Sequence, residues 1–160
     1  MEYMSKEGFD KLSAELEKLI KTKLPEAIQA ISDARDKGDL SENYEYRAAK
    51  REQGRILGRI RFLQNVLTFA RVLPPSQTAD SGLVKLLTRV ELLNLANNQK
   101  SAYTIVSPHE VDTAKGKISI KSPIAKALLN KRRGDVVEVR VPAGTIRLRI
   151  ESVEGYVPTP

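Results

Sequence analysis

Two acidic residues, Asp39 and Glu42, lie three positions apart in the segment Gly38-Asp39-Leu40-Ser41-Glu42-Asn43. Carboxylate oxygens are hard ligands of the kind that Mg²⁺ prefers. Mg²⁺ usually keeps several waters and takes further oxygen ligands, so two carboxylates alone make a sparse site. The pair therefore suggests a metal ion that is shared with a second molecule, which supplies the remaining ligands.

The same spacing also has a purely structural interpretation. An acid followed three residues later by Glu at a helix start is the capping-box pattern, in which Asp39 caps the helix and Glu42 reaches back to it. Ser41 is a competing N-cap. The sequence leaves the metal and the capping interpretations open.

Two long helical patterns flank these acids. The first contains one helical row of apolar residues that shifts by one position in its middle: Phe9, Leu12, Leu16, Leu19, then Ile20, Leu24, Ala27, Ile31 and Ala34. The shift predicts a local phase change in the helix. Pro25 is expected to bend or loosen the helix near Leu24. Ser5 is the predicted N-cap, and Gly38 the predicted end.

The second pattern has alternating steps of three and four residues, with one polar member: Tyr46, Ala49, Gln53, Ile56, Ile60, Leu63, Leu67 and Ala70. This spacing is a coiled-coil heptad. Two helices joined by so short a turn pack antiparallel. About 30 residues at 1.5 Å each give a rod of roughly 45–50 Å. The acids would then lie at the tip of a rod that can enter a cavity in another molecule.

The pattern changes in the second half of the chain. Strand-like segments occupy 83–95, 102–106, 117–121, 136–141 and 145–153, and 142–144 forms a hairpin turn. The sequence of residues 122–129 predicts a short helix, with Ser122 as its N-cap and Pro123 in its first turn. The predicted class is α+β, with a coiled-coil domain over 1–73, a linker over 74–78 and a small, mostly antiparallel sheet domain over 79–160.

The net charge of +7 is unevenly distributed. Residues 44–71 contain a basic stripe with only Glu45 and Glu52 against it: Arg47, Lys50, Arg51, Arg55, Arg59, Arg61 and Arg71. Such a stripe suits a phosphate backbone or an acidic channel. A solvated helix face is the alternative.

The absence of cysteine suits a reducing cytoplasm, and neither a signal peptide nor a membrane span is expected.

Few other residues suggest chemistry. His109 is the single histidine of the chain and is interpreted as a surface-loop residue. Arg133-Gly134-Asp135 is interpreted as a turn. Tyr46 belongs to the heptad, so core packing explains it, whereas Tyr44 lies off the heptad and can face the 3′ end of a nucleic acid.

Three segments resemble the bacterial GreA/GreB family of transcript cleavage factors. They are AISDARDKGDLSENYEYRAAKREQG around the acids, GKISIKSPIAKALLNKRRGDVVEVRVPAG in the second half, and IESVEGY near the end. The resemblance covers nearly the whole chain, and these three segments occur in the order of the family. The tip is more like GreA, while Arg55, Arg59 and Arg61 give a GreB-like basicity.

The resemblance implies that the coiled coil enters the secondary channel of bacterial RNA polymerase. It implies that Asp39 and Glu42 hold a Mg²⁺ ion jointly with the polymerase, with no ion bound tightly by the protein alone. It also implies that the polymerase then cleaves backtracked RNA, so the chain is not itself an enzyme. Arg35 and Lys50 are expected to contact the nascent RNA 3′ end. The second domain, FKBP-like in this family, is expected to grip the channel rim through the loop carrying Ser122 and Pro123.

A monomer without a membrane partner is expected. Three features depart from the family pattern: Tyr44 in place of a common alanine, the leucine-rich segment 83–95, and Ser107-Pro108 in place of a glycine-containing turn.

Two other functions stay open. One is a non-catalytic binder of the same channel that inhibits or retunes transcription. The other is a general nucleic-acid-binding protein that uses its basic stripe.

Overall fold

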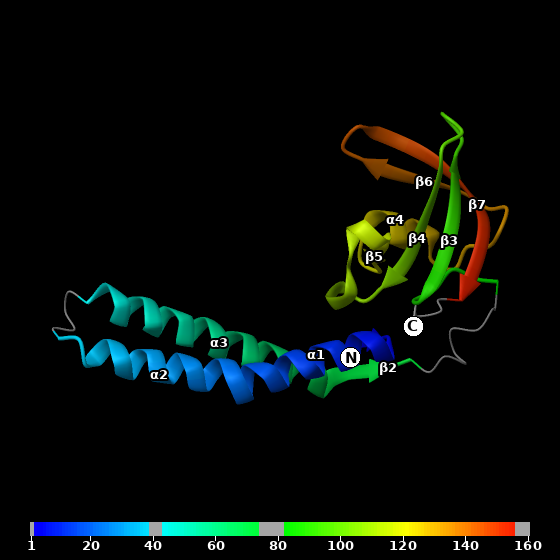
Figure 1. Ribbon diagram of the computed structural model, residues 1–160. Helices are drawn as coiled ribbons and strands as arrows, with labels where there is room; N and C mark the ends of the chain where they lie inside the picture. Colours follow the sequence, from blue (N-terminus) through cyan, green and yellow to red (C-terminus); the bar gives the residue numbers. More distant parts are fainter. Residues whose placement is uncertain (1, 39–42, 74–81, 156–160) are drawn as a thin grey trace. The chain divides into compact units, whose positions relative to one another are not determined.

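The computed structural model describes residues 2–38, 43–73 and 82–155 (Figure 1). The chain divides into two compact units. One is Phe9–Ala70, and the other combines Met1–Gly8 with Arg71–Pro160. The predicted linker 74–78 lies outside the described residues, and the predicted domain boundaries stay predictions.

The first unit is a helical hairpin. Helix α1 (Lys6–Lys18) continues through one π-helical turn, η1 (Leu19–Lys23), into α2 (Leu24–Arg35), and α3 (Tyr44–Phe69) returns beside α2 (Figure 1). The return of α3 beside α2 confirms the antiparallel pair of helices that the sequence predicted.

None of the helices in the described part of the chain is long and apolar enough to cross a membrane.

The predicted phase change coincides with the π turn. In η1 the backbone N–H of Leu24 donates to the carbonyl of Leu19, five residues back. The apolar row therefore steps from Leu19 directly to Leu24. Ile20, which the sequence placed in this row, is 41% exposed, so that assignment was wrong. The wider turn directly precedes Pro25, whose ring would otherwise press on the carbonyl one turn earlier.

The heptad of α3 is confirmed. Ile56 and Ile60 are buried and pack with Ala27 of α2, while Leu16, Leu19 and Leu24 cover this cluster from the first helical arm. The remaining heptad positions are buried or half-buried, and these include the polar Gln53. Burial of one apolar stripe on each helix is the main force that holds such a hairpin together.

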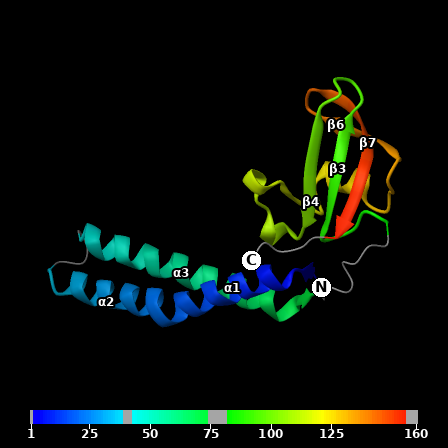
Figure 2. The ribbon, with the colours of Figure 1, turned by 45° about the vertical axis from the view of Figure 1, so that its right-hand side comes forward.

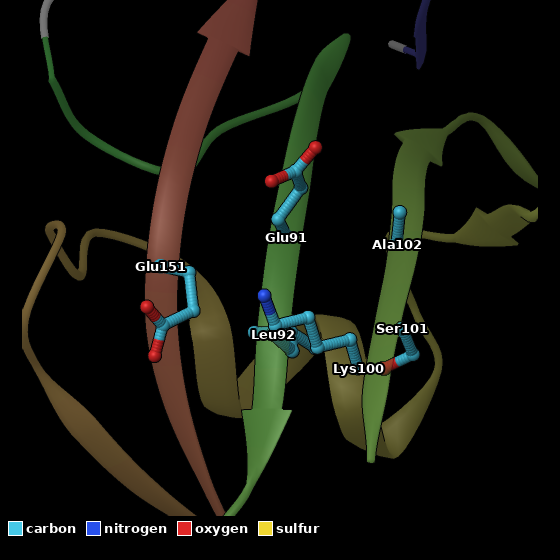
Figure 3. A pocket seen from close by; sticks show the side chains of 6 residues that line it. All are labelled: Glu91, Leu92, Lys100, Ser101, Ala102 and Glu151. Atoms are coloured by element: carbon cyan, nitrogen blue, oxygen red, sulfur yellow. The ribbon is translucent and has the colours of Figure 1, made fainter. Parts of the chain in front are cut away.

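The second unit contains a five-stranded sheet (Figure 2). Its order is β5 (Lys117–Ser119), β4 (Lys100–Val106), β3 (Thr88–Asn94), β7 (Gly144–Gly155) and β6 (Val136–Val141). Neighbouring strands are antiparallel except β4 and β5, which are parallel. The short helix α4 (Pro123–Leu128) contributes Ala125 and Leu128 to the core. The predicted α+β class is confirmed, with one parallel pair added.

Strand boundaries follow the sequence pattern unevenly. Strand β6 matches its predicted range, and Val137 and Val139 face the core while Glu138 is exposed. The predicted strand 83–95 is shorter, because Leu87 has a left-handed φ of 64° and the Thr88 hydroxyl donates to the carbonyl of Lys85 in a turn. Burial explains two leucines of this segment, because Leu87 and Leu92 lie in the interior, whereas Leu95 is exposed.

The N-terminal residues join this second unit. Strand β1 (Glu2–Met4) pairs with β2 (Ala70–Val72). Ser5 caps α1 as predicted, its Oγ accepting from the N–H of Gly8 at 3.0 Å. The Ser5 hydroxyl also donates to Glu110, and the Ser107 hydroxyl donates to Oε2 of Glu110 at 2.8 Å.

His109 belongs to the same region and is not a surface-loop residue, which corrects the interpretation from sequence. It lies in the 3₁₀ turn η3 (Pro108–Glu110), its side chain is 19% exposed, and its Nε2 lies 2.8 Å from Oε2 of Glu2. The hydrogen bond with His109 holds the pKa of the Glu2 carboxyl below its usual value. The unusual Ser107-Pro108 pair therefore begins a turn that anchors the N-terminal strand. A second 3₁₀ turn, η4, covers Thr113–Lys115.

Gly8 and Gly54 are expected to respond oppositely to alanine. A Cβ on Gly8 would lie 2.6 Å from Cγ of Glu110, whose carboxylate is held by Ser5 and Ser107. Gly8→Ala should cost about 1–3 kcal/mol of stability through overpacking. A Cβ on Gly54, in the middle of α3, meets nothing within 4 Å, so Gly54→Ala should stabilise by about 0.5–1 kcal/mol. Thermal unfolding followed by circular dichroism measures both, and a higher midpoint for Gly8→Ala would contradict the packing.

Candidate functional site

The candidate site lies where α2 is connected to α3. Helix α2 ends at Arg35, and Asp36 forms its C-cap. Gly38 has a φ of 125°, a conformation that side chains with a Cβ rarely adopt, and this agrees with its predicted role at the helix end. Asp39, Ser41 and Glu42 lie outside the described residues. The described residues on both sides therefore define the frame of the site.

Asn43 bridges the two helices at this end. Its side-chain Oδ1 accepts a hydrogen bond from the N–H of Tyr46 at 3.0 Å, which makes it the N-cap of α3. Its Nδ2 donates to the carbonyl of Ala34 at 2.7 Å. One amide thus satisfies a free N–H at the start of α3 and adds a donor to the Ala34 carbonyl, which also accepts from the backbone N–H of Lys37 at 3.2 Å.

This bridge answers the capping question that the sequence left open. The N-cap of α3 is Asn43, so the capping role considered for Asp39 and Ser41 is filled by another residue. Sequence reasoning missed Asn43. Asparagine is among the preferred N-caps, and Asn43 lies three residues before Tyr46, the first heptad residue, so a signal was present.

Variants of Asn43 should separate its two hydrogen bonds. Serine at this position can still cap α3 but is too short to reach the carbonyl of Ala34, whereas alanine loses both bonds. We expect Asn43→Ser to cost about 1 kcal/mol and Asn43→Ala about 2–3 kcal/mol, from the usual values for one bond and one cap. Helix unfolding at 222 nm gives the order of stability. Equal midpoints for the parent and Asn43→Ser would show that the bridge to Ala34 contributes nothing.

The two predicted RNA-contacting residues lie on neighbouring helices in this hairpin. Arg35 is exposed at the end of α2, and its guanidinium carbon lies 5.9 Å from the ring centroid of Tyr46 on α3. Lys50 is exposed on α3, and its Nζ donates to Oε1 of Gln53 at 3.5 Å. Tyr46 is half-buried, as its heptad position predicted.

The basic stripe is partly neutralised within the hairpin. Arg59 makes a two-bond ion pair with Glu15 of α1, at 2.9 and 3.0 Å. Arg55 pairs with Glu52 of its own helix. The hydrogen bonds from Arg59 and Arg55 hold the pKa values of the Glu15 and Glu52 carboxyls, respectively, below the usual value for glutamate. Glutamates with a lowered pKa are ionised at neutral pH, so they offset the charge of Arg55 and Arg59.

Positive charge therefore gathers toward the start of α3. Arg47, Lys50 and Arg51 are exposed there. Glu45, the acid of the first turn, is paired with Lys37 at 2.8 Å. Within residues 2–38, 43–73 and 82–155, no three or more His, Cys, Asp or Glu side chains are grouped so that they could hold a metal ion.

The two residues predicted to bind polymerase lie in the other unit. The Ser122 side chain accepts from the N–H of Ala125 at 3.2 Å and caps α4, and Pro123 occupies the first turn, as predicted. Pro123 is exposed, while Ser122 is half-buried. The structure therefore gives Ser122 a helix-capping role and leaves its binding role a prediction.

The fold and the sequence of the connection define a class of two-part protein, in which a helical hairpin with an acidic connecting segment is followed in the chain by a small α+β domain. Two family models match the chain: the N-terminal domain of transcription elongation factors over residues 2–72, and the C-terminal domain of GreA/GreB elongation factors over residues 79–155. The chain belongs to the GreA/GreB family of transcription elongation factors. The family predicted from the sequence is confirmed.

Relatives named transcription elongation factor GreA match over most of their length. The one from Flavobacterium johnsoniae is 45% identical over 92% of this chain and 93% of its own. The one from Thermosipho africanus is 40% identical over 95% and 96%. Among solved structures, the transcription factor Gfh1 is 29% identical, with a TM-score of 0.46 over 96% of this chain and 97% of its own.

Proposed function

We propose that this protein stimulates endonucleolytic cleavage of backtracked RNA by bacterial RNA polymerase and so rescues arrested elongation complexes. The hairpin would enter the secondary channel of the polymerase, in the bacterial cytoplasm. The observation that carries the proposal is the position of Asp39 and Glu42 in the connection between α2 and α3 of a chain that belongs to the GreA/GreB family.

Asp39 and Glu42 are the residues that would hold Mg²⁺ jointly with the polymerase. A second Mg²⁺ ion in phosphodiester hydrolysis stabilises the attacking and leaving oxygens. Carboxylates suit this ion, and two of them leave coordination positions for the ligands of the polymerase. The protein supplies ligands and the polymerase supplies the reaction centre, so the protein is a stimulating factor and not a self-contained enzyme.

The described residues support a role in placing these acids. Asn43 connects the start of α3 to the end of α2 through its two hydrogen bonds. Further along the hairpin, Ile56 and Ile60 pack against Ala27 of α2. A rigid support reduces the conformational entropy that is lost when a partner binds. The hairpin would thus serve as an arm that carries the segment with the two acids to the polymerase.

Further contacts belong to the same proposal. Arg35 and Lys50 are exposed near the connection, where a cation can neutralise the phosphates of the extruded RNA. Pro123, and the α4 N-terminus that Ser122 caps, would contact the channel rim. The pairing of Arg55 and Arg59 with glutamates disfavours general nucleic-acid binding along the whole stripe.

A stalled, backtracked elongation complex tests the proposal. With end-labelled RNA, the protein should release short 3′ fragments much faster than the polymerase does alone. Inhibition of transcription without cleavage would instead identify a non-catalytic channel binder. Tight, salt-sensitive binding to free RNA in the absence of polymerase would identify a general nucleic-acid-binding protein.

A further inference from the structure

Tyr44 is an aromatic residue at the end of the hairpin that the core does not use. It is the first residue of α3 and is 79% exposed, the highest value among the large hydrophobic side chains that the structure describes as exposed. Its neighbour in the heptad, Tyr46, is half-buried. Packing therefore explains Tyr46 and does not explain Tyr44.

Arg47 orders the ring of Tyr44. The guanidinium carbon lies 4.7 Å from the ring centroid, one helical turn further along, within the range of a cation–π contact. Such a contact covers one face of a ring and restricts its rotation. Because most of the side chain is exposed, the remaining surface of the ring is open to a planar partner.

The charge around the ring indicates what that partner is. Tyr44, Arg47 and Arg51 are spaced three and four residues apart, so they share one face of α3. Both arginines are exposed. A ring next to a row of cations matches single-stranded nucleic acid, in which bases stack on aromatic side chains while phosphates contact basic ones.

We propose that Tyr44 and Arg47 form a stacking platform for the unpaired base at the 3′ end of the extruded RNA, with Arg51 on the adjoining phosphate. This inference rests on the proposed function, because it needs the hairpin end to meet backtracked RNA. The platform would add a base-stacking contact at the first turn of α3, two residues after Glu42 in the sequence. It holds the RNA end in place without reading its sequence, since every base has a π-face.

The test is a double-mutant-type cycle, in which Tyr44 of the protein and the 3′ base of the RNA are altered singly and together. Binding of labelled protein to a backtracked complex is measured with a natural 3′ nucleotide and with an abasic one, in an Asp39→Asn/Glu42→Gln background that keeps the RNA intact. On the natural end, Tyr44→Ala should raise the half-saturating concentration roughly 5- to 140-fold, the usual range for one stacked base. On the abasic end, the same substitution should have little effect.

Two matched variants define the contact. Tyr44→Phe keeps the ring and should bind like the parent, whereas Tyr44→Leu keeps apolar bulk without a π-face and should bind like Tyr44→Ala. An equal loss on natural and abasic ends would show that Tyr44 contacts the polymerase protein, and it would overturn the platform. The readout is binding, so a parent protein that binds through the platform yet releases no fragments would contradict the proposed function alone.

Discussion

Replacing Asp39 with asparagine, or Glu42 with glutamine, should lower the rate of stimulated RNA cleavage at least about 100-fold, because even outer-shell partners of a metal cost 10- to 100-fold when they are removed. Each substitution keeps the size of the side chain and removes its negative charge, and a neutral amide is a weaker ligand for Mg²⁺. Release of 3′ fragments from backtracked complexes measures the rate. Competition with labelled parent protein measures polymerase binding, which should stay nearly unchanged.

Glu45 supplies the matched control. It lies in the first turn of α3, and its carboxylate is paired with Lys37. Glu45→Gln therefore removes one acid from the same end of the hairpin without touching the proposed ligands, and cleavage should stay within about twofold, as expected for an exposed ion pair of small net energy. An equal loss for all three variants would indicate a general charge effect. A loss of binding in parallel with cleavage would indicate a structural role for Asp39 and Glu42.

Ile56→Ala should strongly destabilise the hairpin. Ile56 is 2% exposed and packs with Ala27 and Ile60. Truncation of a buried isoleucine removes apolar contacts and leaves a cavity, at a cost of about 2–5 kcal/mol. The midpoint of helix unfolding at 222 nm should fall accordingly. Cleavage should fall with it near that midpoint, because the arm that holds the acids unfolds.

The next residue along α3 is the control for this prediction. Leu57 is 37% exposed, and it is offset from the buried stripe. Leu57→Ala removes a similar amount of side chain at nearly the same place, yet more than a third of this residue is already exposed to water, so less buried apolar surface is lost. Its unfolding midpoint should fall much less than that of Ile56→Ala. Equal destabilisation by the two substitutions would contradict the packing described for the hairpin.

Much of the hairpin could be predicted because helical periodicity reports directly which face is buried. The heptad from Tyr46 to Ala70 identified the seam of α3, and the irregular step in the first arm located the π turn. The error at Ile20 has a simple origin. A π turn adds one residue to the repeat, and the sequence does not show whether the seam continues from Leu19 or restarts at Ile20.

The frame of the candidate site was harder to predict. Asn43 acts through a bond to Ala34, which is nine residues away in the chain and on the other helix. The position of Asn43 three residues before Tyr46 was a local signal for the cap, but no local pattern indicates the bond to Ala34. The chemistry of two carboxylates suggested a shared metal ion at Asp39 and Glu42, whereas the roles assigned to Arg35, Lys50, Ser122 and Pro123 come from the family resemblance. All of these roles stay predictions until cleavage and binding are measured.

In the second unit, the features that depend on neighbouring residues were again predicted correctly, whereas the contacts between residues far apart in the chain were not predicted. The alternation in β6 and the Ser122 cap of α4 are local, and both were predicted. The contact of His109 with Glu2 joins residues 107 positions apart, so no partner of His109 could be recognised from the sequence. The same reason explains why the parallel pairing of β5 with β4 was not foreseen.

The most direct test of a jointly held metal ion is the Mg²⁺ dependence of cleavage. The rate of RNA cleavage in a backtracked complex is measured over a range of Mg²⁺ concentrations for the polymerase alone, with the parent protein, and with the Asp39→Asn/Glu42→Gln variant. If the two carboxylates help to hold the ion, the parent should lower the Mg²⁺ concentration needed for half-maximal cleavage, and the variant should return it to the value of the polymerase alone. The same Mg²⁺ dependence with the parent and with the variant would contradict the proposal that Asp39 and Glu42 are metal ligands.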